Sequence, residues 1–111
     1  MTNSSLTAPA REQLKLATAT TSGRSAHTVF GGHEHWLRQT MIALSAGREL
    51  DEHSNPGEAT VHVLHGRVRL QAGEDSREGA SGHLIDVPQA THSLLALEDA
   101  VVLLTVVSDR P

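Results

Sequence analysis

After residue 26 the sequence alternates short hydrophobic runs with turn-forming residues. The runs at 26–30, 35–44, 83–87 and 91–97 are each followed within three residues by glycine, proline or an acidic residue. Short apolar segments at this spacing are typical of β-sandwiches and β-barrels. The last run, 101–107, is apolar at odd and even positions alike, which predicts a central strand covered on both faces. We therefore expect an all-β fold, with the polar stretch 73–82 as a surface loop.

The segment 60–71 carries the clearest alternation of apolar and polar residues. Its pattern predicts a β-hairpin with a two-residue turn at His65 and Gly66, where glycine supplies the positive φ angle. Because side chains alternate along a strand, this hairpin has two distinct faces. The apolar face, which we expect inside the barrel, consists of Val61, Val63, Val68 and Leu70. The outer face consists of Thr60, His62, Leu64, Arg67, Arg69 and Gln71.

A second hairpin is predicted near the C-terminus. The acidic pair Glu98 and Asp99 separates the run 91–97 from the last strand, as a tight turn would. In this arrangement Leu95 or Leu97 adds to the apolar lining of the barrel.

The N-terminal quarter has a different pattern. Residues 1–7 are small and polar, and we expect a loose tail there. Pro9 suits the first turn of a helix, and Leu14 forms a weak apolar stripe at helical spacing with Ala17 or with Ala10. We therefore divide the chain into a tail (1–7), a helix with its connection (8–25) and a barrel (26–111).

Composition narrows the class of protein. A chain of 111 residues is one domain, and its single Phe and single Trp leave an aliphatic core with no platform for stacking nucleic-acid bases. The net charge of -4 and the scattered basic residues also argue against nucleic acid. No apolar run approaches the roughly 20 residues of a membrane span, and the polar start lacks a signal-peptide core. The absence of cysteine excludes disulfides and thiolate metal sites and is compatible with the cytoplasm, where we expect the protein.

Histidine is the residue type that carries candidate chemistry. Neutral imidazole binds divalent metals such as zinc, iron or nickel. His53 stands just before an inward-facing strand, and His92 opens a later strand, so the two occupy similar strand edges. A catalytic metal site typically needs three protein ligands, and these two alone do not make one.

The spacing around these histidines resembles two motifs of the cupin family, in the expected order. In each motif five residues separate the first two matching positions, which are Gly47 and His53 in the first motif and Gly82 and Pro88 in the second. The residues that carry the resemblance are Gly47, His53 and Gly66 for the first motif, and Gly82, Pro88 and His92 for the second. The resemblance extends over roughly residues 26–108. It implies a double-stranded β-helix, or jelly-roll barrel, which is often a homodimer and often holds one metal ion through three histidines and a glutamate.

Two of the four ligand positions depart from the cupin pattern, the interval from Pro88 to His92 is one residue shorter than usual, and Ala90 replaces a glycine. His53 and His92 match the leading histidine of the first motif and the histidine of the second. Asn55 stands where the family has another histidine, and Ala59 stands where it has the glutamate. Half of the ligand set that the resemblance implies is therefore missing.

Other residues are candidates to complete the site. His33 and His35 lie at the start of a predicted strand, share a face, and one of them could supply a third imidazole. Glu58 is next to the vacant glutamate position, and Asn55 can coordinate through its amide oxygen. The stretch 54–57, Ser-Asn-Pro-Gly, is equally typical of a type II turn. We expect a ligand pocket lined by Asn55, Glu58, Val61, Val63, Val68 and Leu70.

The remaining polar clusters have simpler interpretations. We place His62 on the outer face, His65 in a turn, and His27 and His83 on the surface. The acidic residues at 49, 51 and 52 are interpreted as a solvated loop.

Two functions fit these features best, ahead of a structural dimerisation module, which the strand edges alone support. In the first, a divalent metal such as zinc, iron, manganese or nickel acts on a small organic molecule. In the alternative, a metal-free barrel binds or senses a small ligand without catalysis, so whether the protein is an enzyme stays open. Leu64 and the apolar last strand predict an outer surface that the N-terminal helix or a partner must cover. With the cupin resemblance, this favours a homodimer.

Overall fold

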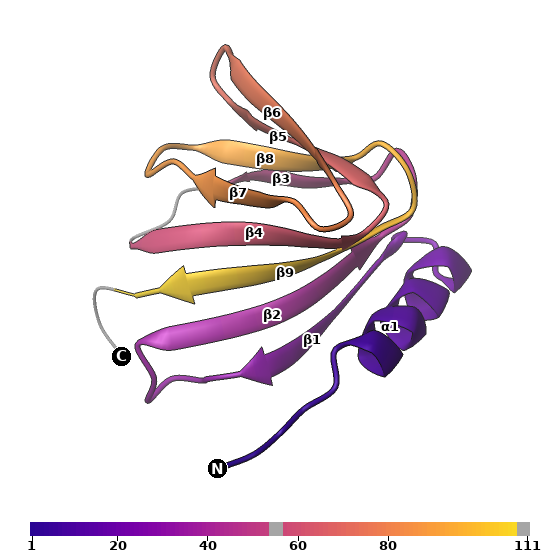
Figure 1. The fold of residues 1–111 in the computed structure, drawn as a ribbon. Coiled ribbons are helices and arrows are strands. Elements are labelled where there is room, and N and C mark those ends of the chain that lie inside the picture. The colour runs from indigo at the N-terminus through magenta and orange to yellow at the C-terminus, as the bar shows by residue number, and fades with distance from the viewer. Residues whose placement is uncertain (54–56, 109–111) are drawn as a thin grey trace.

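The computed structural model describes residues 1–53 and 57–108, except for the side chains of residues 52 and 53. Within these ranges one helix precedes nine strands (Figure 1). The elements are α1 (Thr7–Ala19), β1 (Arg24–Phe30), β2 (Leu37–Leu44), β3 (Glu49–His53), β4 (Glu58–His65), β5 (Arg67–Ala72), β6 (Asp75–Ala80), β7 (Leu84–Val87), β8 (His92–Ala96) and β9 (Ala100–Val107). In the described part of the chain, no helix is long and apolar enough to cross a membrane.

The strands form two antiparallel sheets, as the all-β prediction required. The larger sheet has the order β1-β2-β9-β4-β7, and the smaller sheet has the order β3-β8-β5-β6. From β2 onward the chain passes repeatedly from one sheet to the other, and Figure 1 shows the smaller sheet above the larger one. The inner faces of the two sheets enclose the core.

Both predicted hairpins are wrong. β4 pairs with β7 and β9, whereas β5 pairs with β6 and β8, so the two halves of the segment 60–71 lie in different sheets. β8 and β9 are separated in the same way. Gly66 does have the positive φ that the turn required, at 80°. The turn at Gly66 therefore carries the chain between sheets instead of folding it back within one.

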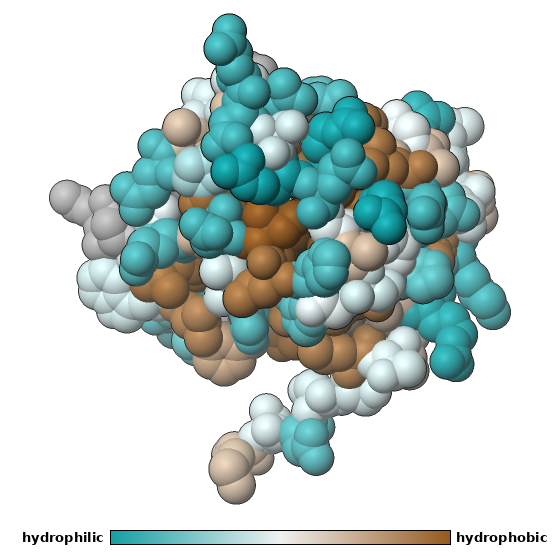
Figure 2. Space-filling model, turned by 45° about the horizontal axis from the view of Figure 1, so that its top comes forward, coloured by the Kyte–Doolittle hydropathy of each residue, from teal (hydrophilic) through white to brown (hydrophobic). Residues whose placement is uncertain are grey.

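The predicted surface loop at 73–82 is also wrong. Residues 75–80 form β6, which pairs along its length with β5. β6 is the edge strand of the smaller sheet, and its first four residues are exposed. Figure 2 shows hydrophilic side chains over this hairpin. An exposed edge strand needs no apolar alternation, and charged residues there discourage pairing with other chains.

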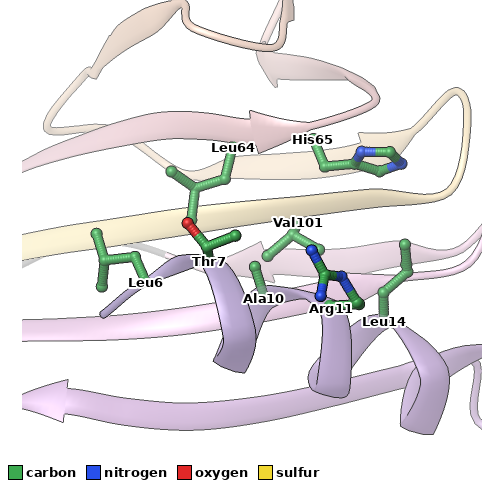
Figure 3. Close-up of a pocket in the computed structure, with 8 residues that line it drawn as sticks. All are labelled: Leu6, Thr7, Ala10, Arg11, Leu14, Leu64, His65 and Val101. Atoms are coloured by element: carbon green, nitrogen blue, oxygen red, sulfur yellow. The ribbon is translucent and has the colours of Figure 1, made fainter. Parts of the chain in front are cut away.

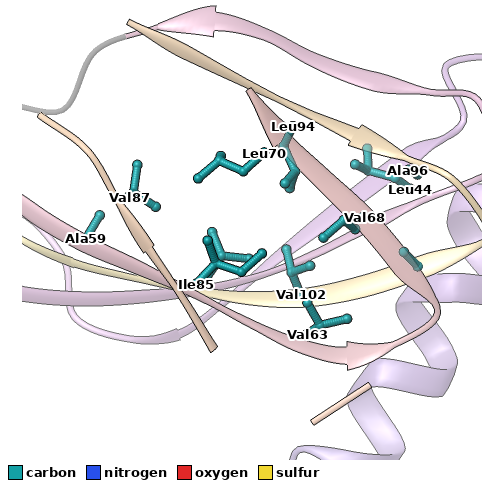
Figure 4. Packing of buried hydrophobic residues seen from close by; sticks show 12 residues of the cluster. Leu44, Ala59, Val63, Val68, Leu70, Ile85, Val87, Leu94, Ala96 and Val102 are labelled. Atoms are coloured by element: carbon teal, nitrogen blue, oxygen red, sulfur yellow. The ribbon is translucent and has the colours of Figure 1, made fainter. Parts of the chain in front are cut away.

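The predicted inner face is confirmed although the pairing is not. Val61 and Val63 of β4 and Val68 and Leu70 of β5 are at most 5% exposed and belong to one cluster between the sheets (Figure 4). The two strands face each other across the core instead of lying side by side. The expected contribution of Leu95 or Leu97 is wrong by one residue. The buried members of β8 in this cluster are Leu94 and Ala96.

A second apolar cluster lies on the outer face of the larger sheet, beneath α1. Ala10, Leu14 and Ala17 all pack into it, so both predicted pairings of Leu14 belong to one helix face. On β9, Val101 points into this cluster and Val102 points into the core between the sheets. The prediction of a central strand covered on both faces is therefore confirmed.

Gly66→Ala should lower the free energy of unfolding by more than about 2 kcal/mol, as measured by urea denaturation. A positive φ costs a residue with a Cβ roughly 1–2 kcal/mol, and the new methyl group would also overlap the carbonyl oxygen of Asp99. Gly32→Ala is the control, because a Cβ at Gly32 meets no atom within 4 Å. Equal destabilisation by the two substitutions would contradict this account of the turn at Gly66.

Candidate functional site

A cavity of about 340 Å³ lies between the two sheets. Its lining, among the described residues, consists of eight aliphatic side chains and three polar ones. The aliphatic residues are Ile42, Leu50, Val61, Leu70, Val87, Leu94, Val102 and Leu104, and the polar residues are Arg24, Asp51 and His92. Small-molecule sites commonly combine an apolar wall with a few convergent polar groups, and this volume is at the small end of their range.

His92 is the buried polar group of the cavity. It is the first residue of β8 and is 4% exposed. Its Nδ1 lies 2.8 Å from the carbonyl oxygen of Ala90. A carbonyl can only accept, so Nδ1 donates, and in the neutral ring the lone pair is then on Nε2. Such a bond fixes both the tautomer and the orientation of a histidine that meets a ligand or a metal.

His53 lies opposite His92 in the smaller sheet. It is the last residue of β3, and the two backbones are register partners. Leu50 pairs with Leu94, so a regular ladder would bring residue 52 opposite His92. The ladder is irregular between Leu50 and His53, and one additional residue in β3 changes the register, as in a β-bulge. The two histidines chosen from the sequence are therefore cross-strand neighbours in the backbone.

Sequence reasoning missed two charged residues at the cavity. The acidic residues at 49–52 are not a loop, because Glu49–His53 form β3, and Asp51 lines the cavity. Alternation along the strand could not identify it, because the adjacent residues Leu50 and Asp51 both line the cavity where β3 is irregular. Arg24 precedes the first predicted strand, and no pattern in the sequence identified it. Both side chains are exposed, so they lie at the rim of the cavity, whereas His92 is buried.

The other predicted pocket residues are dispersed. Val61 and Leu70 line the cavity, whereas Val63 and Val68 are buried in the surrounding cluster. Glu58 is exposed and belongs to a separate surface hollow with Asp86 and Gln89. The other predicted pocket residue, Asn55, lies outside the described residues.

His33 and His35 are in a loop and not at the start of a strand. β2 begins at Leu37, and both histidines are exposed in the connection from β1. The ring of His35 packs edge-on against Phe30, with centroids 5.3 Å apart. Neither histidine lines the cavity. Among the side chains that the structure describes, no three His, Asp or Glu groups gather in a way that could hold a metal ion.

The arrangement of two facing sheets recurs in solved structures. The chain is 28% identical to the conserved SPY1581 protein of unknown function from Streptococcus pyogenes, over 83% of this chain and 80% of that one, with a TM-score of 0.73. A cupin superfamily protein from Desulfitobacterium hafniense is 13% identical, over 85% and 88% of the two chains, with a TM-score of 0.73. An RmlC-like cupin from Desulfovibrio desulfuricans is 24% identical, over 76% and 81%, with a TM-score of 0.66.

The chain has the cupin fold. The jelly-roll architecture expected from the two motifs is thereby confirmed. No protein-family model matches the sequence, and no curated protein matches it. At these identities the likeness to the cupin structures concerns the fold, and the function has to be argued from the cavity of this barrel.

The tautomer of His92 can be tested directly. We expect long-range ¹H–¹⁵N spectra at pH 8 to show the hydrogen on Nδ1, because the carbonyl of Ala90 requires a donor there. His83 is a matched contrast, because its Nδ1 accepts a hydrogen bond from the backbone N–H of Ala80 at 3.1 Å. The two rings should therefore show opposite patterns. An unprotonated Nδ1 in His92 would contradict the geometry described above.

Proposed function

We propose that this cupin barrel binds a small organic molecule in the cavity beside His92. The observation that carries the proposal is the cavity itself, an aliphatic space of about 340 Å³ with one buried, oriented histidine. Its aliphatic wall favours a ligand with an apolar body, because burying a polar group without a partner is costly. His92 supplies a polar contact inside, and Asp51 and Arg24 supply charge at the rim.

Ligands of this class should be found by thermal-shift screening of small organic molecules with an aliphatic body and one polar group. A ligand at one hundred times its dissociation constant stabilises the folded state by about 2.7 kcal/mol, which raises the melting temperature of a domain of this size by roughly 10 °C. Leu50→Phe, which fills part of the cavity, and His92→Ala, which removes its buried polar contact, should each reduce this shift strongly. Leu37→Phe is the matched control, because Leu37 is 37% exposed and does not line the cavity. Undiminished shifts in both cavity variants would refute the proposed site.

A second candidate function is metal-dependent chemistry in the same cavity, and the register of His53 with His92 favours it. Asp51 and His92 are the described potential donors in the lining, and Ala59 offers none at the position of the family's glutamate. These two fall short of three ligands, so His53 would have to complete the set. Two imidazoles and a carboxylate are the donor set of non-haem iron sites. A divalent ion held there would supply a Lewis acid.

This second function predicts about one equivalent of divalent metal per chain in protein purified without an affinity tag. Elemental analysis should then show a loss of most of that metal in the His53→Ala/His92→Ala double variant, and Asp51→Asn should weaken metal binding. His33→Ala/His35→Ala should retain the metal, because neither residue lines the cavity. Equal, sub-stoichiometric metal in wild type and the His53/His92 variant would eliminate this candidate and leave the metal-free binding function standing.

The homodimer stays a prediction, but the structure moves the surface on which two copies would meet. α1 packs against Leu64 and Val101, so the N-terminal helix, one of the two covers expected for this surface, lies over part of it. Large exposed hydrophobic residues instead occur near the β1–β2 loop. Phe30 and Trp36 are 45% and 53% exposed, and Leu37 is the register partner of the exposed Val107. Apolar surface at this end of the larger sheet is now the better candidate for a contact between two copies.

A further inference from the structure

A groove of about 330 Å³ lies outside the barrel, between α1 and the larger sheet (Figure 3). α1 packs mainly on β1 and β2 and only partly on β9, so the outer face beside β4 is left as a channel along the helix. Its apolar lining consists of Leu6, Ala10, Leu14, Leu64 and Val101. This groove and the barrel cavity lie on opposite faces of one sheet, since Val101 lines the groove and the next residue, Val102, lines the cavity.

The groove lining contains the basic residue Arg11 and, among the described residues, no acidic one. Arg11 of α1 and His65 of β4 both line it, and Figure 3 labels both side chains. No aspartate or glutamate is among the described lining residues, and the first turn of α1 contains no acidic residue. Arg11 makes no hydrogen bond or ion pair with any described residue. An unpaired guanidinium therefore stands at the edge of an aliphatic channel.

We propose that this groove is a second binding site, for a short aliphatic carboxylate. The guanidinium of Arg11 matches a carboxylate geometrically and can bind it through two parallel hydrogen bonds. The hydrocarbon chain would lie along Leu14 and Leu64, over the floor formed by Val101. The volume is at the small end of small-molecule sites, which suits a short chain better than a folded partner. The site does not depend on any ligand of the barrel cavity.

The site can be tested by titrating ¹⁵N-labelled protein with octanoate, octan-1-ol and octylammonium, three probes with one chain and different charge. Octanoate should bind most tightly and octylammonium least, with shifts centred on the amides of Ala10, Leu14, Leu64 and Val101. Arg11→Gln should weaken octanoate binding about tenfold and leave octan-1-ol unchanged, because only the charged contact is lost. Leu64→Ser should weaken both. Arg77→Gln is the matched control, since Arg77 pairs with Asp75 on the distant β6 strand.

Several results would overturn the proposal. If Arg11→Gln keeps its octanoate affinity while circular dichroism shows an intact helix, the guanidinium of Arg11 does not bind the carboxylate. Loss of octanoate binding in His92→Ala would place the ligand in the barrel cavity instead. Groove amides that shift with protein concentration and not with octanoate would show that a second copy of the chain occupies the groove.

Discussion

The burial of β9 on both faces is the constraint on which the rest of the structure depends. β9 pairs with β2 along its length and with β4 on its other side, and a strand covered on both faces has to be central. Ala100 and Val102 join the core between the sheets, whereas Val101 joins the cluster under α1. Full burial of a valine side chain stabilises the folded state by roughly 1.5–3 kcal/mol. One short run of sequence therefore joins the barrel and the helix into a single unit.

The two hollows of the molecule share this strand. Val102 and Leu104 line the barrel cavity, and Val101 forms part of the outer groove. A substitution that shifts the backbone of β9 would therefore change the shape of both the cavity and the groove, since close-packed interiors transmit displacement. The polar groups of the two hollows come from other elements. β1, β3 and β8 contribute them to the cavity, and α1 and β4 contribute them to the groove. β9 supplies the shared apolar wall.

The sequence predicted which face of each strand is buried better than it predicted which strands pair with each other. Period-two alternation is a local property, so Val61, Val63, Val68 and Leu70 were placed inside correctly, whereas the partner of each strand depends on the whole chain. Gly66 indicated a reversal but not which sheet the next strand would join. β8 has leucine at the adjacent positions 94 and 95, which point to opposite faces of a strand. Alternation therefore gave no basis to prefer Leu94 as the buried residue. The choice of His53 and His92 as candidate ligands came from the motif resemblance, which did not predict that they would be register partners. Neither the irregular register that produces this pairing nor the role of Arg24 has a local sequence signal.

Ala59 bears most directly on what the cavity can do. It is 6% exposed and packs in the core between the sheets, at the position where the cupin resemblance expects a metal-binding glutamate. A carboxylate buried at this point would be costly unless a cation compensated its charge. The methyl group removes that requirement and adds to the apolar packing instead. The fold of this barrel therefore does not need an ion to balance a charge at position 59. The polar groups that remain at the cavity, above all His92, are then left to determine which molecule it accepts.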